Sequence, residues 1–366
     1  MTHTAELHTG ITQVEYYALL THKDSRTEND RRYHIRSLAR YGITDISPRR
    51  YAKPGLTYYY CIAIINLERL VNGGKKTVKT YQNESDFEKL DTTFTEYMKE
   101  VLPSHSSVNG WTVQRIDYNI DIRLADQEEV EQYIILLQMG DKASSWKVHE
   151  TEAEAQRRKQ SKHGQRRKGH PTGSVLYDNQ RYSVNIYNKL LERQQEQEKR
   201  GVTDEQELKE AERILRIEVQ SKRGKLQYLK KKNYGQEFEG RPLQAFACFE
   251  MAENTVTSVL KAIAGETDYL SMERAKERIR ASHTPPKATE NMIAFLRTIR
   301  TRKSVWNAKV HYDGSMKPES IIKRLQGLNI NPVTIPNTFG KEEMENLYHR
   351  VCVQFAEEKA IQQNGY

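Results

Sequence analysis

The sequence predicts an α+β fold: a largely antiparallel sheet with helices on one face, plus a small, mainly helical module at the C-terminal end. Three observations lead to this prediction. Residues 111–123 alternate between apolar and polar side chains, as a strand with one buried face does. Residues 173–189 have the pattern of a two-stranded hairpin, and apolar residues recur at helical spacing in 85–102. Strands and helices mixed in this way favour an antiparallel sheet.

The composition limits the function. The chain has 366 residues and a formal net charge of +9, with the cations in clusters. Clustered positive charge indicates a polyanionic partner, most simply a nucleic acid. Acidic lipid is the rival, but the sequence has no bilayer-spanning apolar run, signal peptide or lipidation motif, so no membrane partner is expected. The three cysteines lack metal-ligand spacing and are expected to be reduced thiols of a cytoplasmic protein.

The elements of the first part of the chain follow in order. Residues 1–56 are a basic N-terminal segment, expected to form short helices and loops that pack on the core and end at the Lys53-Pro54-Gly55 turn. Residues 57–67 are rich in aromatic and β-branched side chains and predict a strand. The helix over 85–102 is expected to stop before Pro103. Its apolar residues are Phe87, Leu90, Phe94, Met98 and Val101.

The remaining elements alternate between strands and helices. Asp126, with Glu129 three residues later, predicts the start of a helix over 126–138. The segment 151–172 has almost no apolar content and is expected to be a loop. After the hairpin come a charged helix over about 190–213, a strand over 214–220 and helices in 225–280. A break at Thr284-Pro285-Pro286 then separates a catalytic domain, 57–283, from a helical accessory module, 284–366.

The stretch RYSVNIYNK, residues 181–189, carries the first chemical signal. If it is one strand, Val184 and Ile186 face the core, and Tyr187 and Lys189 share the opposite, polar face. A tyrosine beside an ammonium group can act as a nucleophile on phosphate, because the cation lowers the pKa of the phenol. The plainer interpretation is an edge strand with an exposed aromatic ring.

Two more strands bring charged groups to the same polar face. Residues 111–123 contribute Asp117 and Asp121, and residues 214–220 contribute Arg216 and Glu218. Carboxylates from two strands suit Mg²⁺ or Mn²⁺, which would polarise a phosphodiester for attack by Tyr187. The alternative is that these residues form solvated ion pairs, which contribute little to stability.

Three blocks, in chain order, resemble the rolling-circle replication initiators. They are RIDYNID (115–121), SVNIYNKLLER (183–193) and LRIEVQSKR (215–223). Two branches are similar: the Rep_trans-type initiators of small Gram-positive plasmids, with relaxases of conjugative elements among them, and the gene II/gene X proteins of filamentous phages. The resemblance covers about residues 57–230 and implies a HUH-nickase-like Rep core.

The resemblance also implies an activity, that of a metal-dependent DNA nickase that starts rolling-circle replication of a plasmid or phage. It implies Tyr187 as the nucleophile, which forms a 5′-phosphotyrosyl link and leaves a free 3′-hydroxyl for a polymerase. Asp117 and Glu218, with Asp121 as a third group, match ligands of Mg²⁺ or Mn²⁺. Lys189 and Arg216 would stabilise phosphate charge or hold the carboxylates. The sequence lacks the His-hydrophobic-His motif of related nickases, so its metal ligands are less defined than its tyrosine.

A basic run before the hairpin is the candidate DNA-binding segment. It would hold DNA through phosphate contacts; the alternative is a solvated linker. Its cations are Arg157, Arg158, Lys159, Lys162, Arg166, Arg167 and Lys168.

The expected partner is single-stranded or melted origin DNA in the cytoplasm of a bacterial host. A host helicase or polymerase and a second copy of the chain are further candidate partners. Two other functions stay open from the residues alone. One is a relaxase of a conjugative element, and the other is a non-catalytic origin- or operator-binding protein.

Overall fold

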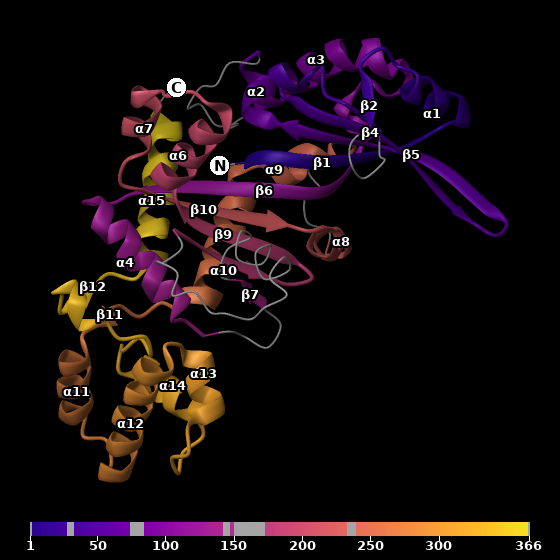
Figure 1. Ribbon diagram of the computed structural model, residues 1–366. Helices are drawn as coiled ribbons and strands as arrows, with labels where there is room; N and C mark the ends of the chain where they lie inside the picture. Colours follow the sequence, from indigo (N-terminus) through magenta and orange to yellow (C-terminus); the bar gives the residue numbers. More distant parts are fainter. Residues whose placement is uncertain are drawn as a thin grey trace, which may run out of the picture. The chain divides into compact units, whose positions relative to one another are not determined.

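The computed structural model describes residues 2–27, 33–73, 84–141, 147–149, 173–232 and 239–364. Within them the chain is an α+β protein with a large antiparallel sheet, so the predicted class is confirmed (Figure 1). The strands hydrogen-bond in the order β2-β3-β4-β5-β1-β6-β10-β9-β8-β7. In the part of the chain that the structure describes, no helix combines the length and the apolar character needed to cross a lipid bilayer.

Two compact units make up the chain, and each is assembled from segments far apart in the sequence. Unit 1 comprises Met1–Asn119, Gln180–Ser183 and Glu218–Val256, and unit 2 comprises Ile120–Asn179, Val184–Ile217 and Thr257–Tyr366. Strands β6, β9 and β10 and helix α10 contribute residues to both units. This division differs from the three consecutive ranges expected from the sequence.

Unit 1 is organised around β1 (Thr2–Ile11). This strand pairs antiparallel with β5 (Leu56–Asn66) on one side and with β6 (Thr112–Arg123) on the other. The expectation that residues 1–56 form only short helices and loops is therefore wrong. The two apolar side chains in the middle of β1, Ala5 and Leu7, are fully buried, but two residues make a weak alternation. This segment forms a strand because it pairs with strands remote in the sequence, and its own side-chain pattern is too weak to predict that.

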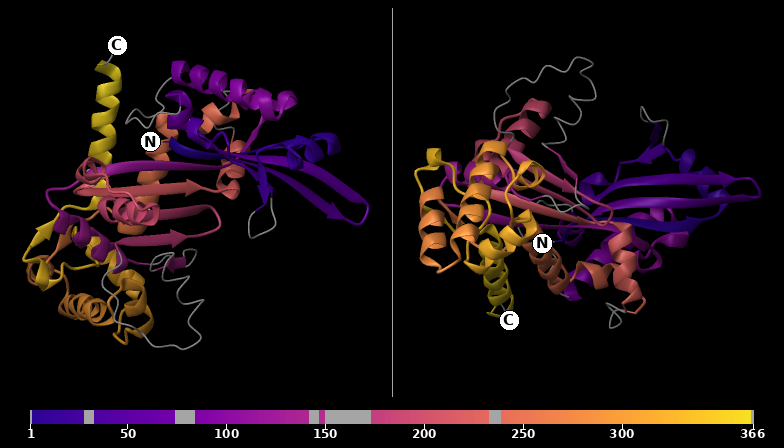
Figure 2. Two further views of the ribbon diagram at one scale, coloured as in Figure 1. Left: turned by 45° about the horizontal axis from the view of Figure 1, so that its top comes forward. Right: turned by 90° about the horizontal axis from the view of Figure 1, so that it is seen from below.

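A long hairpin extends unit 1. Strand β4 (Ile43–Lys53) pairs antiparallel with β5 through a two-residue connection, Pro54-Gly55 (Figure 2). Gly55 has φ +74°, and proline followed by a positive-φ glycine is the signature of a type II turn. The predicted turn is thus present. Strands β2 (Ser25–Thr27) and β3 (Tyr33–Ile35) add to the edge beyond β4.

The helices of unit 1 cover the apolar side chains of these strands. The longest within it, α3 (Glu84–Val101), buries Phe87, Leu90, Phe94 and Met98, as its spacing predicts. Trp111, just before β6, meets the Phe94 ring edge-on at 5.9 Å between ring centres. The others are α1 (Gln13–Leu20), α2 (Leu67–Val71), α8 (Arg223–Lys231), α9 (Pro242–Ala247) and the first half of α10 (Phe249–Ala264).

Unit 2 contains the hairpin and the charged helices that follow it. The hairpin is β8 (Ser174–Asp178) and β9 (Tyr182–Asn188), as predicted, and the strand expected at 214–220 is β10 (Ile214–Ser221). Helix α4 (Gln127–Gln138) begins where the sequence places it, because Asp126 Oδ1 accepts a hydrogen bond from Glu129 N at 2.8 Å. The unit also includes β7 (Lys147–His149), α6 (Lys189–Arg200) and α7 (Glu205–Ala211).

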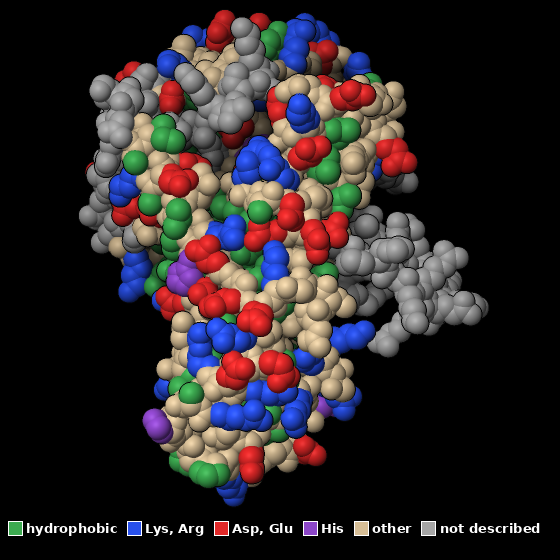
Figure 3. Space-filling view, turned by 90° about the vertical axis from the view of Figure 1, so that its left-hand side faces the viewer, with side chains coloured by type: hydrophobic (Ala, Val, Ile, Leu, Met, Phe, Trp, Pro, Cys, Tyr) green, Lys and Arg blue, Asp and Glu red, His purple; other side chains and the backbone are tan. Residues whose placement is uncertain are grey.

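The C-terminal part of unit 2 is mainly helical, as expected. A short strand pair links it across the Thr284-Pro285 break, since β11 (Tyr269–Leu270) is antiparallel to β12 (Glu343–Met344). Its helices are α11 (Met272–Ala281), α12 (Pro286–Arg302), α13 (Val305–His311), α14 (Pro318–Gly327) and α15 (Leu347–Asn364). Cationic and anionic side chains are interspersed over this end, seen at the bottom of Figure 3. Local pairs such as Lys276–Glu273, 2.7 Å, account for part of the mixture, which is typical of a solvated surface.

Candidate functional site

Tyr187 lies at the end of β9, where the strand passes directly into helix α6. The next residue, Asn188, caps that helix: its Oδ1 accepts hydrogen bonds from Leu190 N at 3.1 Å and Leu191 N at 3.3 Å. The expectation that 181–189 is a single strand is therefore wrong at its end, because Lys189 is the first residue of α6. Tyr187 is also more enclosed than an open polar face implies, with 8% of its surface exposed.

Lys189 is nevertheless close to Tyr187. Its Nζ lies 5.8 Å from the centre of the phenol ring and 3.2 Å from Glu192 Oε2, one helical turn further on. The lysine is buried, and burial lowers its pKa, as does the positive charge of Arg216. The carboxylates of Glu192 and Asp121 oppose this effect. The strand-to-helix junction thus places a partly compensated cation next to the predicted nucleophile.

Arg216 makes a two-point contact with Asp121. Its Nε donates to Oδ1 at 2.5 Å and its Nη2 donates to Oδ2 at 2.6 Å. Planar guanidinium and carboxylate groups pair in this way with high geometric specificity. The contact joins neighbouring strands, β10 and β6, and both carboxylate oxygens of Asp121 accept hydrogen bonds from the arginine. The arrangement fixes the orientation of Arg216 beside Lys189.

Asp117, four residues earlier on β6, belongs to unit 1 and has a different environment. Its pKa is raised to about 6, mainly by burial and also by the nearby Glu218 carboxylate, while Arg115 and a hydrogen bond with Gln220 oppose the shift. Arg115 Nε lies 3.2 Å from Asp117 Oδ1, and Arg115 Nη1 lies 3.4 Å from Glu6 Oε2. Asp117 and Glu218 are therefore near neighbours, as the register of two adjacent strands predicts.

A complete metal site is not built from the described residues. Among them no group of three or more His, Cys, Asp or Glu side chains is arranged to hold a metal ion. Asp121 is engaged by Arg216 through both oxygens. Asp117 and Glu218 are near enough for the Glu218 charge to raise the pKa of Asp117, but among the described residues no third His, Cys, Asp or Glu side chain joins them in a metal-binding arrangement. The predicted three-carboxylate set does not fit a divalent ion in this arrangement.

The predicted DNA-binding segment lies outside the described residues, so Arg157, Arg158, Lys159, Lys162, Arg166, Arg167 and Lys168 have no structural account here.

Unit 1 contains another basic cluster, in which cations lie over tyrosine rings. The Lys225 ammonium lies 5.6 Å from the Tyr182 ring centre and 5.7 Å from that of Tyr228, and the Arg181 guanidinium lies 5.2 Å from Tyr228. Cations over aromatic faces suit contacts with a nucleic acid.

Two charged groups at the β9–α6 junction, Glu192 and Arg193, are not among the residues predicted for the site. Arg193 lies 3.6 Å from Glu192 and also pairs with Glu196 at 2.5 Å and Glu207 at 3.5 Å. Both residues lie in the quoted block SVNIYNKLLER. Because Lys189 begins the helix, Glu192 and Arg193 lie one turn away from it, at the i+3 and i+4 spacing that the block itself contains.

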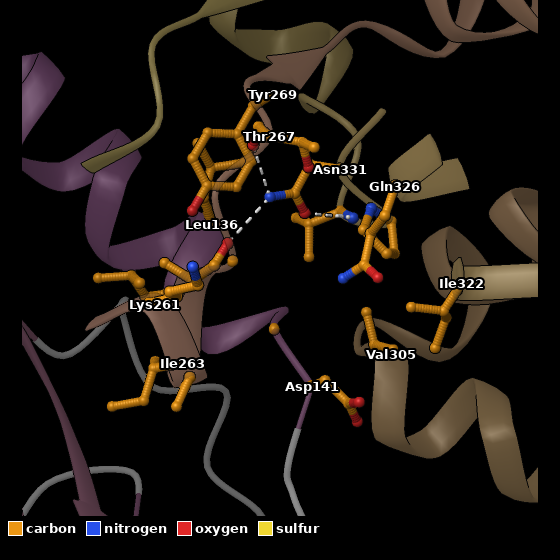
Figure 4. Close-up of a pocket in the computed structure, with 17 residues that line it drawn as sticks. Leu136, Asp141, Lys261, Ile263, Thr267, Tyr269, Val305, Ile322, Gln326 and Asn331 are labelled. Carbon is orange, nitrogen blue, oxygen red and sulfur yellow. Dashed lines mark hydrogen bonds between the residues drawn. The ribbon is translucent and has the colours of Figure 1, made fainter. Parts of the chain in front are cut away.

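A separate cavity in unit 2, of about 120 Å³, shows no comparable chemistry (Figure 4). Its lining mixes apolar side chains such as Leu136 and Val305 with polar ones such as Asp141 and Lys261. Asn331 also lines the cavity, and its Nδ2 donates to the carbonyls of Ala264 and Thr267, both at 3.0 Å. These bonds are internal to the fold, which indicates a structural role.

Comparisons with protein-family models, with curated proteins and with solved structures gave no match for this chain.

Proposed function

We propose that this protein is a tyrosine-type single-strand DNA endonuclease and strand transferase that initiates rolling-circle replication of a plasmid or phage. Its sheet would then be a HUH-nickase-like Rep core. The observation that supports the proposal most is the β9–α6 junction. There Lys189 Nζ lies 5.8 Å from the centre of the Tyr187 ring, beside Arg216, which is oriented by Asp121. A phenol next to one cation, with a second cation close to the first, suits attack on a phosphodiester.

The proposed step balances without an oxidant or reductant. The Tyr187 phenol oxygen attacks phosphorus, the bond from phosphorus to the 3′-oxygen breaks, and the phenol proton is transferred, directly or through water, to the departing 3′-oxygen. The products are a 5′-phosphotyrosyl link and a free 3′-hydroxyl. A host polymerase would extend that end, and a host helicase would separate the strands.

The two cations have separate proposed roles. Lys189, with its pKa lowered by burial, would stabilise negative charge on the phenol oxygen, since its ammonium lies near the ring. Arg216 would bind a non-bridging phosphate oxygen in the transition state. Arg216 already donates two hydrogen bonds to Asp121, so Asp121 acts on the reaction through the arginine. Mg²⁺ or Mn²⁺ remains a proposed requirement, with Asp117 and Glu218 as the carboxylates to test.

A covalent adduct is the direct test. The full-length chain is incubated with a randomised single-stranded DNA library labelled at its 3′ end, with Mn²⁺, and the products are separated under denaturing conditions. The label is expected to migrate with the protein, and mass spectrometry of the digested adduct should place it on Tyr187. Tyr187→Phe should abolish the adduct and keep DNA binding.

Tyr177→Phe is the matched control. Tyr177 lies on the other strand of the same hairpin, and its hydroxyl donates to the Leu137 carbonyl at 2.7 Å. This variant should still form the adduct. The nickase proposal fails if Tyr187→Phe retains the adduct, or if the wild-type chain binds single-stranded DNA without ever becoming attached to it. The second result would leave a DNA-binding protein that does not cleave.

A further inference from the structure

Four aromatic rings form a continuous row on one face of unit 1. Tyr51 and Tyr58 are paired in register across β4 and β5, with ring centres 4.9 Å apart and planes at 30°. Tyr58 and Tyr60, two residues apart on β5, have centres 5.8 Å apart. Tyr60 stacks on His8 of β1 at 5.6 Å and 28°. We call these four residues the aromatic row.

The row belongs to the sheet face opposite helix α1. Alternate residues of a strand point to opposite faces, so Tyr59 lies on the other side from Tyr58 and Tyr60. Tyr59 is covered there by Tyr16 of α1, with ring centres 4.9 Å apart. Tyr58, in the middle of the row, has 47% of its surface exposed. An exposed ring within a cluster of aromatic side chains is typical of an interaction surface.

Cations accompany the row. Lys53 Nζ lies 5.2 Å from the Tyr51 ring centre, and Arg49 is paired in register with Tyr60. Arg49 Nη1 donates to two backbone carbonyls, those of Pro48 at 3.3 Å and Tyr33 at 3.5 Å. In the described residues neither cation forms an ion pair with a carboxylate. Positive charges beside the rings suit an anionic partner.

The His8 end of the row is held in place by charged groups. His8 Nε2 lies 2.8 Å from Glu6 Oε1, and Glu6 also pairs with Arg115. The hydrogen bond with His8, and then the charge of Arg115, lower the pKa of Glu6, so its carboxylate stays ionised. Arg115 in turn pairs with Asp117. The row thus runs from the exposed hairpin to the charged residues of β6.

We propose that the aromatic row is a stacking platform for single-stranded DNA. Aromatic faces accept unpaired bases of any sequence, and adjacent cations hold the phosphates. Paired bases hide their faces, so a duplex would gain little from the row. The choice of DNA over RNA rests on the proposed function; the choice of a single strand rests on the rings and cations.

Binding of a fluorescent oligothymidylate longer than about 16 nucleotides, enough for one stacking site, tests the proposal in the full-length protein. Tyr58→Ala should weaken binding roughly 5- to 150-fold, the range for loss of one stacked base. Tyr58→Phe should bind like the wild type, because stacking uses the ring and not the hydroxyl. Tyr17→Ala is the matched control: Tyr17 lies on α1 with 48% of its surface exposed and is outside the row.

The outcomes separate this inference from the nickase proposal. Unchanged binding by Tyr58→Ala, with circular dichroism showing a folded chain, overturns the platform, whatever the adduct assay shows. Loss of binding in Tyr58→Ala supports it even if no adduct ever forms. Equal loss in Tyr17→Ala, or tighter binding of oligouridylate than of oligothymidylate, also overturns it, because the effect is then not specific to the row or to DNA.

Discussion

Arg216 holds both carboxylate oxygens of Asp121, with Nε 2.5 Å from Oδ1 and Nη2 2.6 Å from Oδ2. The pair connects two neighbouring strands, and Arg216 is also one of the charges that lower the pKa of Lys189. This relationship changes the expected role of Asp121 from a metal ligand to a positioning residue for the arginine that we propose binds phosphate.

Asp121→Asn should therefore act mainly through Arg216. The amide replaces a charged acceptor by a donor, and a mostly buried guanidinium loses half of its contact, so the free energy of unfolding should fall by about 1–3 kcal/mol. The separate variant Arg216→Lys, which keeps Asp121, should lose less stability than Asp121→Asn. It should still form the adduct more slowly than the wild type, because an ammonium cannot make a two-point contact. Urea unfolding and single-turnover adduct rates measure the two effects. A shift in the Mn²⁺ concentration required, with stability unchanged, would instead restore Asp121 as a ligand.

Asp117 should make stability depend on pH. Its pKa in the fold is about 6, above the ordinary aspartate value of 3.8, so the folded state binds the proton more tightly. The stabilisation is complete below pH 3.8 and is lost as the pH rises towards 6. The loss is at most about 3 kcal/mol from the shift alone, and smaller in practice because the side chain is 19% exposed to screening solvent. The free energy of unfolding of Asp117→Asn should lack this decline.

The control for that titration is Glu205→Gln, which removes an exposed carboxylate of α7. It should leave the difference in stability between pH 4 and pH 7 as in the wild type. If Asp117→Asn shows the same pH dependence as the wild type, Asp117 is not the titrating group.

Lys225 should contribute to the salt dependence of DNA binding. Its ammonium lies over the rings of Tyr182 and Tyr228, and the Arg181 guanidinium also lies over the ring of Tyr228. Lys225→Ala should weaken binding of all sequences alike and reduce the slope of log K against log salt by about 1. Lys261→Ala is the comparison, since Lys261 of α10 pairs with Glu266 at 2.8 Å. An unchanged slope for Lys225→Ala would separate this cluster from DNA binding.

Asn331 and Asn346 should be energetically coupled. Both side chains donate to the same two carbonyls, those of Ala264 and Thr267, at 2.8–3.0 Å. After either single change to alanine, each carbonyl keeps one asparagine donor. After the double change, neither carbonyl has an asparagine donor. The double variant should therefore lose about 1 kcal/mol more than the sum of the single variants. Asn331→Ala combined with Asn307→Ala, which shares neither carbonyl, should be additive in urea unfolding.

Local patterns predicted the elements whose burial follows their own sequence. Helix α3 and strand β6 were predicted to within about two residues, because their apolar side chains repeat at the period of the element. Strand β1 was missed because its place in the sheet depends on β5 and β6 rather than on its own side chains. The same limit applies to the site. The strands carrying Tyr187, Asp121 and Arg216 were predicted, but the capping of α6 by Asn188 was not.

The sequence by itself determined the class of the fold, the hairpin that carries Tyr187 and the charged residues on the strands around it, because period and turn chemistry are local properties. Only the tertiary structure decided how those charges pair. It joined Asp121 to Arg216, buried Lys189 beside Tyr187, raised the pKa of Asp117 and aligned Tyr51, Tyr58, Tyr60 and His8 in one row. Pairing, burial and stacking depend on the register between strands remote in the chain, which no local pattern contains.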